Sequence, residues 1–206
     1  GGPTAAGYPT TEPTAVGDGR GTMFEAERAH GYATPTTGAR IVPEPILAAY
    51  LLAGGPGGTY GYPTGDVVHS AGRTEATQTF EGGTISVTSP HVAFVEAAHE
   101  DFLGRPPSQA ELEARVGALE VGTTTRASFV RELATSEEYV SRLVQRFYRD
   151  TLGRDGGGPE VAYWIEQLRS RRMGVARVAA LFYASDEYHD GIGGGDDRSW
   201  IADLYA

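Results

Sequence analysis

The chain has 206 residues and a formal net charge of −10, from 17 basic and 27 acidic side chains. This acidity disfavours nucleic acid as a partner, because binding phosphates requires a basic face. Cysteine is absent, which excludes disulfides, thiolate metal sites and cysteine nucleophiles, and no apolar run is long enough for a transmembrane helix.

The choice of basic residues indicates the base composition of the source genome. All 17 basic residues are Arg, and both Lys and Asn are missing, so every residue encoded by an AAN codon is absent. Selection for arginine forks at interfaces would not explain the missing Asn. We therefore attribute the pattern to a GC-rich genome.

The character of the sequence changes near Pro90. Gly, Pro and Thr dominate before this residue, whereas Ala, Glu, Leu and Arg at helical spacing dominate after it. The sequence therefore predicts an α+β protein of two domains. The first, residues 1–90, is expected to be rich in strands and turns, and the second, residues 91–206, to be an all-α bundle.

The first domain contains an internal repeat. A Gly-Tyr-Pro-Thr motif at 7–10 and a Phe-Glu pair at 24–25 recur at 61–64 and 80–81. Turn formers and short strands such as 84–88 lie between these anchors. One helix is predicted at 44–52, because Pro45 suits its first turn and glycines follow its end.

With the Thr-Gly-Ala-Arg-Ile-Val segment at 37–42, these motifs resemble LGFP repeats over about residues 1–90. The resemblance implies an actinobacterial envelope protein, because such repeats accompany wall hydrolases and mycolyltransferases and are thought to hold them to the wall. Tyr replaces the Phe of the family motif, and the second copy lacks the Thr-Gly-Ala-Arg and helix portion. The next domain or another chain is expected to supply this missing half.

The second domain repeats with a period of 49 residues. Leu-Gly-Arg at 103–105 recurs at 152–154, and Ser-x-Glu-Tyr at 136–139 recurs at 185–188. Helices are predicted at 109–119, 126–133, 159–169 and 175–183. We expect each Leu-Gly-Arg glycine to end a helix, its arginine to tie down the next loop, and each motif serine to cap a helix. A wall phosphate or carboxylate is the alternative ligand of these arginines.

The expected core of the bundle is aromatic: Tyr148, Trp164, Tyr188, Leu152 and Phe182, with Tyr139 in the place of Tyr188 in the first unit. Residues 91–206 resemble a helical family of uncharacterised function that accompanies secreted and surface-layer-type proteins and is distantly like phycobilisome-linker domains. This resemblance implies no enzymatic activity.

No catalytic or metal constellation is evident. The five histidines lack the spacing of a zinc pair, and neither a Gly-x-Ser-x-Gly motif nor a phosphate loop occurs. We therefore expect a non-enzyme without a cofactor. Asp150 with Asp155, and Asp196 with Asp197, are weak candidates for calcium, although the EF-hand ligand pattern is missing.

The candidate glycan-binding residues lie in or near the repeat motifs of the first domain. The tyrosine of each Gly-Tyr-Pro motif either fills a small core or offers a platform to a sugar face. The candidates are Tyr8, Glu12, Glu25, Arg40, Tyr62, Asp66 and Glu81. The net acidity favours neutral wall polysaccharide or peptidoglycan sugars over anionic polymers.

The end of the chain carries candidate residues for self-association. Trp200, Ile201, Leu204 and Tyr205 resemble the opening helix of a third repeat. Such an apolar helix is expected to pack onto its own bundle or into a neighbouring molecule, which would make a homo-oligomer or filament.

The sequence therefore predicts a non-catalytic, secreted protein of the cell wall or cell surface that acts as a wall-binding or scaffold module. One alternative is a self-assembling extracellular filament or surface-layer subunit. Another is the targeting region of a cell-wall hydrolase.

Overall fold

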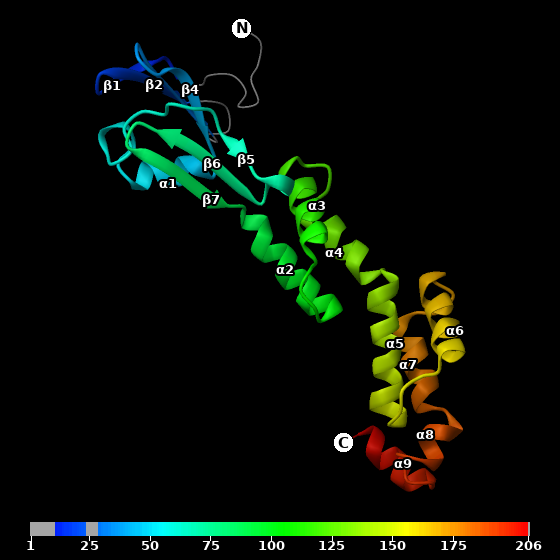
Figure 1. Ribbon diagram of the computed structural model, residues 1–206. Coiled ribbons are helices and arrows are strands. Elements are labelled where there is room, and N and C mark those ends of the chain that lie inside the picture. Colours follow the sequence, from blue (N-terminus) through cyan, green and yellow to red (C-terminus); the bar gives the residue numbers. More distant parts are fainter. Residues whose placement is uncertain (1–10, 24–28, 206) are drawn as a thin grey trace. The chain divides into compact units, whose positions relative to one another are not determined.

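The structure is a computed structural model that describes residues 11–23 and 29–205. It forms two compact units, the first within residues 1–97 and 107–124 and the second within 98–106 and 125–206. In the described residues, all strands precede Pro90 and helices α2 to α9 follow (Figure 1). The predicted α+β organisation is confirmed.

Four antiparallel strands in the order β1-β2-β3-β4 form the first sheet. They are β1 (Thr14–Val16), β2 (Gly19–Met23), β3 (Ala29–Thr34) and β4 (Gly38–Pro43). The Thr34 hydroxyl accepts a backbone hydrogen bond of 2.9 Å in the β3–β4 turn, and Gly38 there has a φ of 71°, which favours glycine. Because side chains alternate along β3, Tyr32 points into the core, and Gly31 and Ala33 lie on the other face.

Three antiparallel strands in the order β5-β6-β7 form the second sheet. They are β5 (Val68–His69), β6 (Glu75–Phe80) and β7 (Gly83–Thr88), and the short helices η2 (Gly55–Gly57) and η3 (Ala71–Arg73) lie in the connections. Strand β7 contains the segment predicted at 84–88. Along β6, Ala76, Gln78 and Phe80 are buried, whereas Glu75 and Thr79 are exposed.

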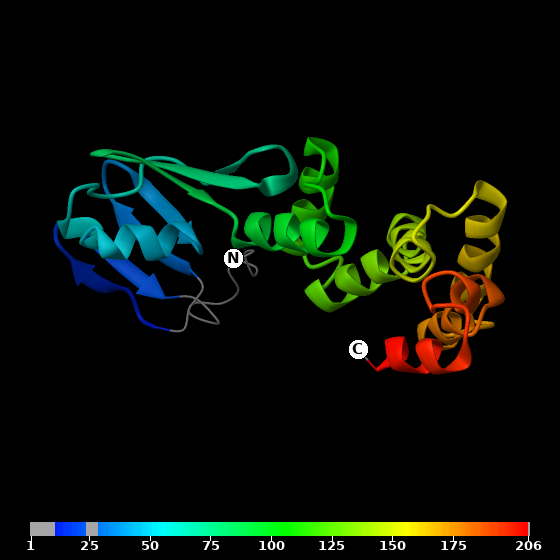
Figure 2. The same cartoon turned by 90° about the horizontal axis from the view of Figure 1, so that it is seen from below.

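Helix α1 (Ile46–Leu52) joins the two sheets into one core, and it confirms the helix predicted at 44–52. It contacts β4 of the first sheet and both β6 and β7 of the second (Figure 2). The ring of Tyr50 lies 5.5 Å from that of Tyr32 and 4.7 Å from that of Phe80, measured between centroids. One helix therefore serves both copies of the repeat.

Helix α3 (Gln109–Glu120) completes the first unit. A capping box starts this helix, since Ser108 and Glu111 each accept the other's backbone amide. The helix lies so close to η3 that no side chain would fit at Gly72, which faces Glu113. Within this chain, α1 therefore packs on β6 and β7 of the second copy, and α3 packs on η3.

The limits of the compact units differ from the change in composition at Pro90. Helix α2 (Pro90–Leu103) begins at that residue, but the division falls within it, between Ala97 and Ala98, and α3 belongs to the first unit. The first compact unit therefore extends beyond residue 90. The domains assigned at 1–90 and 91–206 stay a prediction.

The second unit is helical throughout its described residues. Its further helices are α4 (Arg126–Ala134), α5 (Glu137–Leu152), α6 (Gly158–Arg169), α7 (Val175–Tyr183), α8 (Asp186–Asp190) and α9 (Asp197–Leu204). The four helices predicted from the repeat therefore occur within one or two residues of their expected ends. The Ser-x-Glu-Tyr helix continues into the next unit only in α5, because glycines follow α8 and end it at Asp190.

The predicted aromatic core is present. Tyr148, Phe182 and Tyr188 are buried, while Trp164 and Leu152 pack against the same cluster and stay partly exposed. The Trp164 indole donates a hydrogen bond of 3.1 Å to the Tyr148 hydroxyl, which satisfies its polar atom. Tyr139 is half-buried rather than buried like its equivalent Tyr188.

The Leu-Gly-Arg motif holds the fold together, as predicted. Gly153 ends α5 with a φ of 65°, and Arg154 then reaches Glu187 in the first turn of α8 and Glu160 in the first turn of α6. In the first repeat, Arg105 contacts Glu138 in the same way. Ser136 and Ser185 cap α5 and α8 by accepting the amides of the two tyrosines.

We expect the Arg154 contacts to stabilise the fold only above the pH at which their carboxylates titrate. Hydrogen bonds from Arg154 lower the pKa of Glu187 and of Glu160 in the folded chain. A lowered folded pKa gives stability that is present above the unfolded value of about 4.3 and is lost as the pH falls through the lowered values. In thermal unfolding, Arg154→Met should therefore lower Tm at pH 7, and the difference from wild type should close below about pH 4.

Arg146→Met is the matched control, because Arg146 is exposed on α5 and makes no ion pair with the described residues. This variant should follow the wild-type Tm at every pH. A deficit of Arg154→Met that stays constant down to pH 3 would assign the effect to packing of the arginine over the Tyr148 ring, 5.0 Å away.

Candidate binding surface

Strand register builds a hollow on the outer face of the first sheet. Arg20 on β2 lies opposite Ala33 on β3, which in turn lies opposite Ala39 on β4. This row points away from the core, because the neighbouring row contains the buried Tyr32. The outer face therefore presents small side chains in its middle and an arginine at one side.

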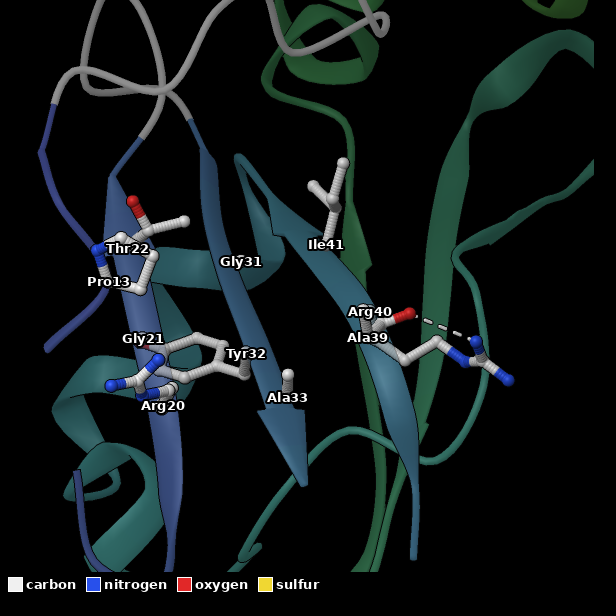
Figure 3. A pocket seen from close by; sticks show the side chains of 10 residues that line it. All are labelled: Pro13, Arg20, Gly21, Thr22, Gly31, Tyr32, Ala33, Ala39, Arg40 and Ile41. Atoms are coloured by element: carbon white, nitrogen blue, oxygen red, sulfur yellow. Dashed lines mark hydrogen bonds between the residues drawn. The ribbon is translucent and has the colours of Figure 1, made fainter. Parts of the chain in front are cut away.

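The hollow has a volume of about 430 Å³ (Figure 3). Its lining residues are Pro13, Arg20, Gly21, Thr22, Gly31, Tyr32, Ala33, Ala39, Arg40 and Ile41. Figure 3 shows Pro13 and Thr22 at one side and Ile41 at the other, with the small residues between them. A flat ligand can therefore lie against the backbone of the sheet.

Arg20 is the charged group of this hollow that remains available. Its side chain has no hydrogen bond or ion pair with residues 11–23 or 29–205. Arg40 instead bends away from the hollow, where its Nη1 donates a hydrogen bond of 3.0 Å to the Ala39 carbonyl (Figure 3). Among the described residues, no carboxylate lines the hollow. A guanidinium without a partner can donate to sugar hydroxyls or to an anionic group.

The chain that precedes β1 is tied to the rim. The Thr22 hydroxyl donates a hydrogen bond of 2.7 Å to the Thr11 carbonyl, and the two hydroxyls lie 3.3 Å apart. This contact places Pro13 beside the hollow.

Two buried tyrosines, Tyr32 and Tyr50, lie on the core side of the first sheet. Burial, with a smaller effect of Tyr62, raises the pKa of Tyr32 to about 12, and burial also raises the pKa of Tyr50. Both hydroxyls therefore stay protonated near neutral pH. The Tyr50 hydroxyl donates a hydrogen bond of 2.6 Å to the Gly61 carbonyl, which links α1 to the second Gly-Tyr-Pro motif.

Tyr62 was a candidate glycan-binding residue, and the structure corrects that assignment. Its side chain is only 4 % exposed, so the ring offers no platform to a sugar. The hydroxyl accepts a hydrogen bond of 2.9 Å from the Gly19 amide and donates one to the Val16 carbonyl, so it fastens the β1–β2 turn. Glu81 is another candidate glycan-binding residue. Its carboxylate accepts a hydrogen bond of 2.9 Å from the Tyr62 amide and thereby supports the same core position.

The other predicted glycan contacts are not brought to one place. Arg40 and Asp66 form a loose ion pair, with Nε and Oδ1 3.7 Å apart, and Glu12 is exposed near the N-terminal end of the first sheet. Tyr8 and Glu25 lie outside the described residues. Of the predicted set, only Arg40 lines the hollow.

Sequence reasoning missed Arg20 and the small floor residues. The available signal is the alternation along β3, where Gly31 and Ala33 interleave with larger side chains. That signal does not reveal the partner strands, because register is a non-local property.

The terminal helix α9 docks partly onto its own unit. The Trp200 indole donates a hydrogen bond of 3.1 Å to the Tyr183 carbonyl, and its ring lies 6.0 Å from that of His189. Ile201 and Tyr205 remain 51 % and 89 % exposed. Leu204 belongs to the helix, but its side chain is outside the described residues.

Three of the four aspartates considered for calcium have other partners, including Asp197, which lies 3.3 Å from His189. Asp155 pairs with Arg149 at 2.6 Å, and Asp196 accepts the amides of Arg198 and Ser199 at the start of α9. Within the part of the chain that the structure describes, no group of three or more metal-ligating side chains occurs. Among the described helices, none has the length and apolar character that crossing a bilayer requires.

Comparison with known families identifies the segment that contains the hollow. Residues 7–58 match the LGFP repeat, so the predicted LGFP repeat is confirmed for the first copy. An LGFP repeat indicates a cell-surface or wall-associated module. No curated protein matches the chain.

Proposed function

We propose that this protein is a non-catalytic, secreted module that binds a cell-wall polymer through the hollow on the outer face of the first sheet. The observation that carries the proposal is the position of that hollow. All of its lining residues, from Pro13 to Ile41, fall within the segment that matches the LGFP repeat.

The chemistry of the hollow suits a sugar. Pro13, Ala33 and Ile41 offer apolar contact to the C–H face of a ring, and Arg20 offers hydrogen-bond donors to its hydroxyls. Because the hollow is open and shallow rather than enclosed, it can accept an internal unit of a long polymer. Peptidoglycan or wall polysaccharide is the ligand class that fits this geometry.

We also propose that the hollow binds its ligand without catalysing a reaction. A hydrolase requires a nucleophile or a pair of carboxylates beside a general acid or base. Those residues that line the hollow in the described part of the chain include neither a carboxylate nor a histidine. The Thr22 hydroxyl at its rim is hydrogen bonded to Thr11.

Filling the hollow tests the proposal directly. In Ala33→Phe, a ring stands on the outer face between Arg20 and Ala39, and retention on insoluble actinobacterial wall material should fall about tenfold or more. Arg20→Met should also weaken retention, because it removes the donors and keeps the apolar stem.

The matched control is Ser86→Phe, which adds the same ring at an exposed position on the second sheet. It should leave retention unchanged. Wild-type retention no higher than that of a neutral control protein would refute the proposal, as would equal retention of Ala33→Phe and Ser86→Phe.

A further inference from the structure

Two loops of the helical repeats share one backbone conformation. In the α3–α4 loop the Gly122 amide donates to the Leu119 carbonyl at 3.3 Å, and in the α6–α7 loop the Arg171 amide donates to the Leu168 carbonyl at 3.1 Å. The φ angle is 74° at Gly122 and 58° at Arg171. These residues are 49 positions apart, so the chain itself supplies a comparison.

Arg171 therefore occupies a position that the first repeat gives to glycine. A left-handed backbone is unfavourable for a residue with a Cβ, because the Cβ approaches a carbonyl oxygen. The Arg171 side chain has no hydrogen bond or ion pair with the described residues that would offset this cost. Contacts of the Arg171 side chain with the described residues therefore do not explain why this position holds an arginine.

The whole α6–α7 loop differs in charge from its counterpart. Segment 119–129 contains one acidic and one basic residue, whereas segment 168–178 contains four arginines and no acid: Arg169, Arg171, Arg172 and Arg177. Arg169 pairs with Glu137 at 2.7 Å and Arg172 lies 3.9 Å from Glu166, while Arg177, like Arg171, has no partner among the described residues. In a chain of charge −10, residues 169–177 are a local basic surface, here called the basic loop.

The opposite end of the same unit is acidic. Residues 186–197, here called the acidic end, include Asp186, Asp190, Asp196 and Asp197. The side chains of Asp190 and Asp197 contact the His189 ring at 2.9 and 3.3 Å, and they remain 76 % and 93 % exposed. Exposed apolar residues accompany both charges, with Val175 at the basic loop and Ile192 and Ile201 at the acidic end.

Helix α7 separates the two surfaces. The basic loop includes the first residues of α7 and the acidic end follows this helix, and Figure 1 shows them at opposite ends of α7. Nine helical residues span about 13 Å, so α7 holds the two surfaces apart within one molecule.

We propose that the basic loop of one molecule binds the acidic end of a second copy, head to tail. Guanidinium forks match carboxylates geometrically, and the exposed apolar residues on both surfaces add contact area. The net negative charge of each copy does not prevent this contact, because salt screens charges beyond about 8 Å. A contact between two different surfaces generates an open chain of molecules unless the rotation closes a ring.

Two variants of the full chain test the contact. Arg171→Gly with Arg172→Thr gives the basic loop the residues of Gly122 and Thr123, and Asp190→Asn with Asp197→Asn removes two of the four aspartate charges of the acidic end. In sedimentation equilibrium, wild type should form concentration-dependent oligomers that weaken as salt rises. Each variant alone should associate about tenfold more weakly, because two ion pairs are lost.

Mixing the loop variant with the acidic-end variant tests whether the contact is head to tail. The intact acidic end of the loop variant should bind the intact basic loop of the other variant, giving a 1:1 dimer that cannot extend. A wild-type protein that stays monomeric at about 1 mM, or a mixture that stays monomeric while wild type associates, would overturn the proposal. Monomeric wild type that is retained on an anionic polymer through Arg171 would assign the loop to that polymer instead.

A single substitution separates the proposed role from a structural one. Arg171→Gly should have a Tm at least equal to that of wild type, because glycine relieves the left-handed backbone, and should associate more weakly. A clear fall in Tm would show that Arg171 stabilises its own unit and would contradict the inference.

Discussion

Phe182→Ala should lower the free energy of unfolding of the helical unit by about 3–5 kcal/mol, the range for large-to-small changes at buried aromatics. Phe182 is 4 % exposed, and its ring centroid lies 4.8 Å from that of Tyr148 and 5.4 Å from that of Trp164. Removing the ring leaves a cavity between three helices. The loss is a large part of the stability of a domain of this size.

Tryptophan fluorescence makes this measurement specific to the helical unit, because both tryptophans of the chain, Trp164 and Trp200, lie in it. Urea unfolding followed by this signal should show the transition of Phe182→Ala at a lower concentration. Tyr163→Ala is the control, since that ring is 52 % exposed, and it should cost under about 1 kcal/mol. Similar losses in the two variants would mean that Phe182 is not the centre of the core.

The helical unit was predictable because the sequence signals of its helices are local and occur in both repeats. Helix period, N-cap serines and left-handed glycines are read from a few consecutive residues. The 49-residue repeat then checks each assignment, as with Gly104 and Gly153, whose φ angles are 58° and 65°. Equivalent buried positions also coincide, since Val95 and Val144 are both fully buried.

The candidate site was not predictable in the same way. Motif residues such as Tyr62 and Glu81 were natural candidates for binding, but the fold uses them to fasten a turn and a core. The hollow arises where Arg20, Ala33 and Ala39 meet across three strands. Only register brings these residues together, and a sequence pattern does not specify register across three strands.

The role of α1 was missed for a related reason. A partial second copy without its own helix suggested that another element was needed to cover it. The structure places the helix of the first copy on both sheets, with the Tyr50 ring stacked on Phe80 and edge-on to Tyr32. A helix of seven residues is too short to reveal from its sequence that two of its faces are buried.

Tyr62→Phe should destabilise the first unit by about 1–3 kcal/mol, although it removes a single oxygen atom. Two backbone groups, the Gly19 amide and the Val16 carbonyl, lose their partner in a part-buried place. Tyr62→Ala should cost about 3–5 kcal/mol, since the buried ring is lost as well. Hydrogen exchange of the β1 and β2 amides measures the stability of the first unit separately from that of the helical unit.

Tyr60→Phe is the matched control, because Tyr60 is half-buried beside Phe80 and its hydroxyl makes no hydrogen bond with the described residues. It should cost under about 0.5 kcal/mol. Below its melting temperature, Tyr62→Phe should keep wild-type retention on wall material, because the ring lies inside the core and not at the hollow. If Tyr62→Phe were retained more weakly while its amide exchange rates stayed unchanged, Tyr62 would contact the ligand. That result would refute its role in stabilising the core.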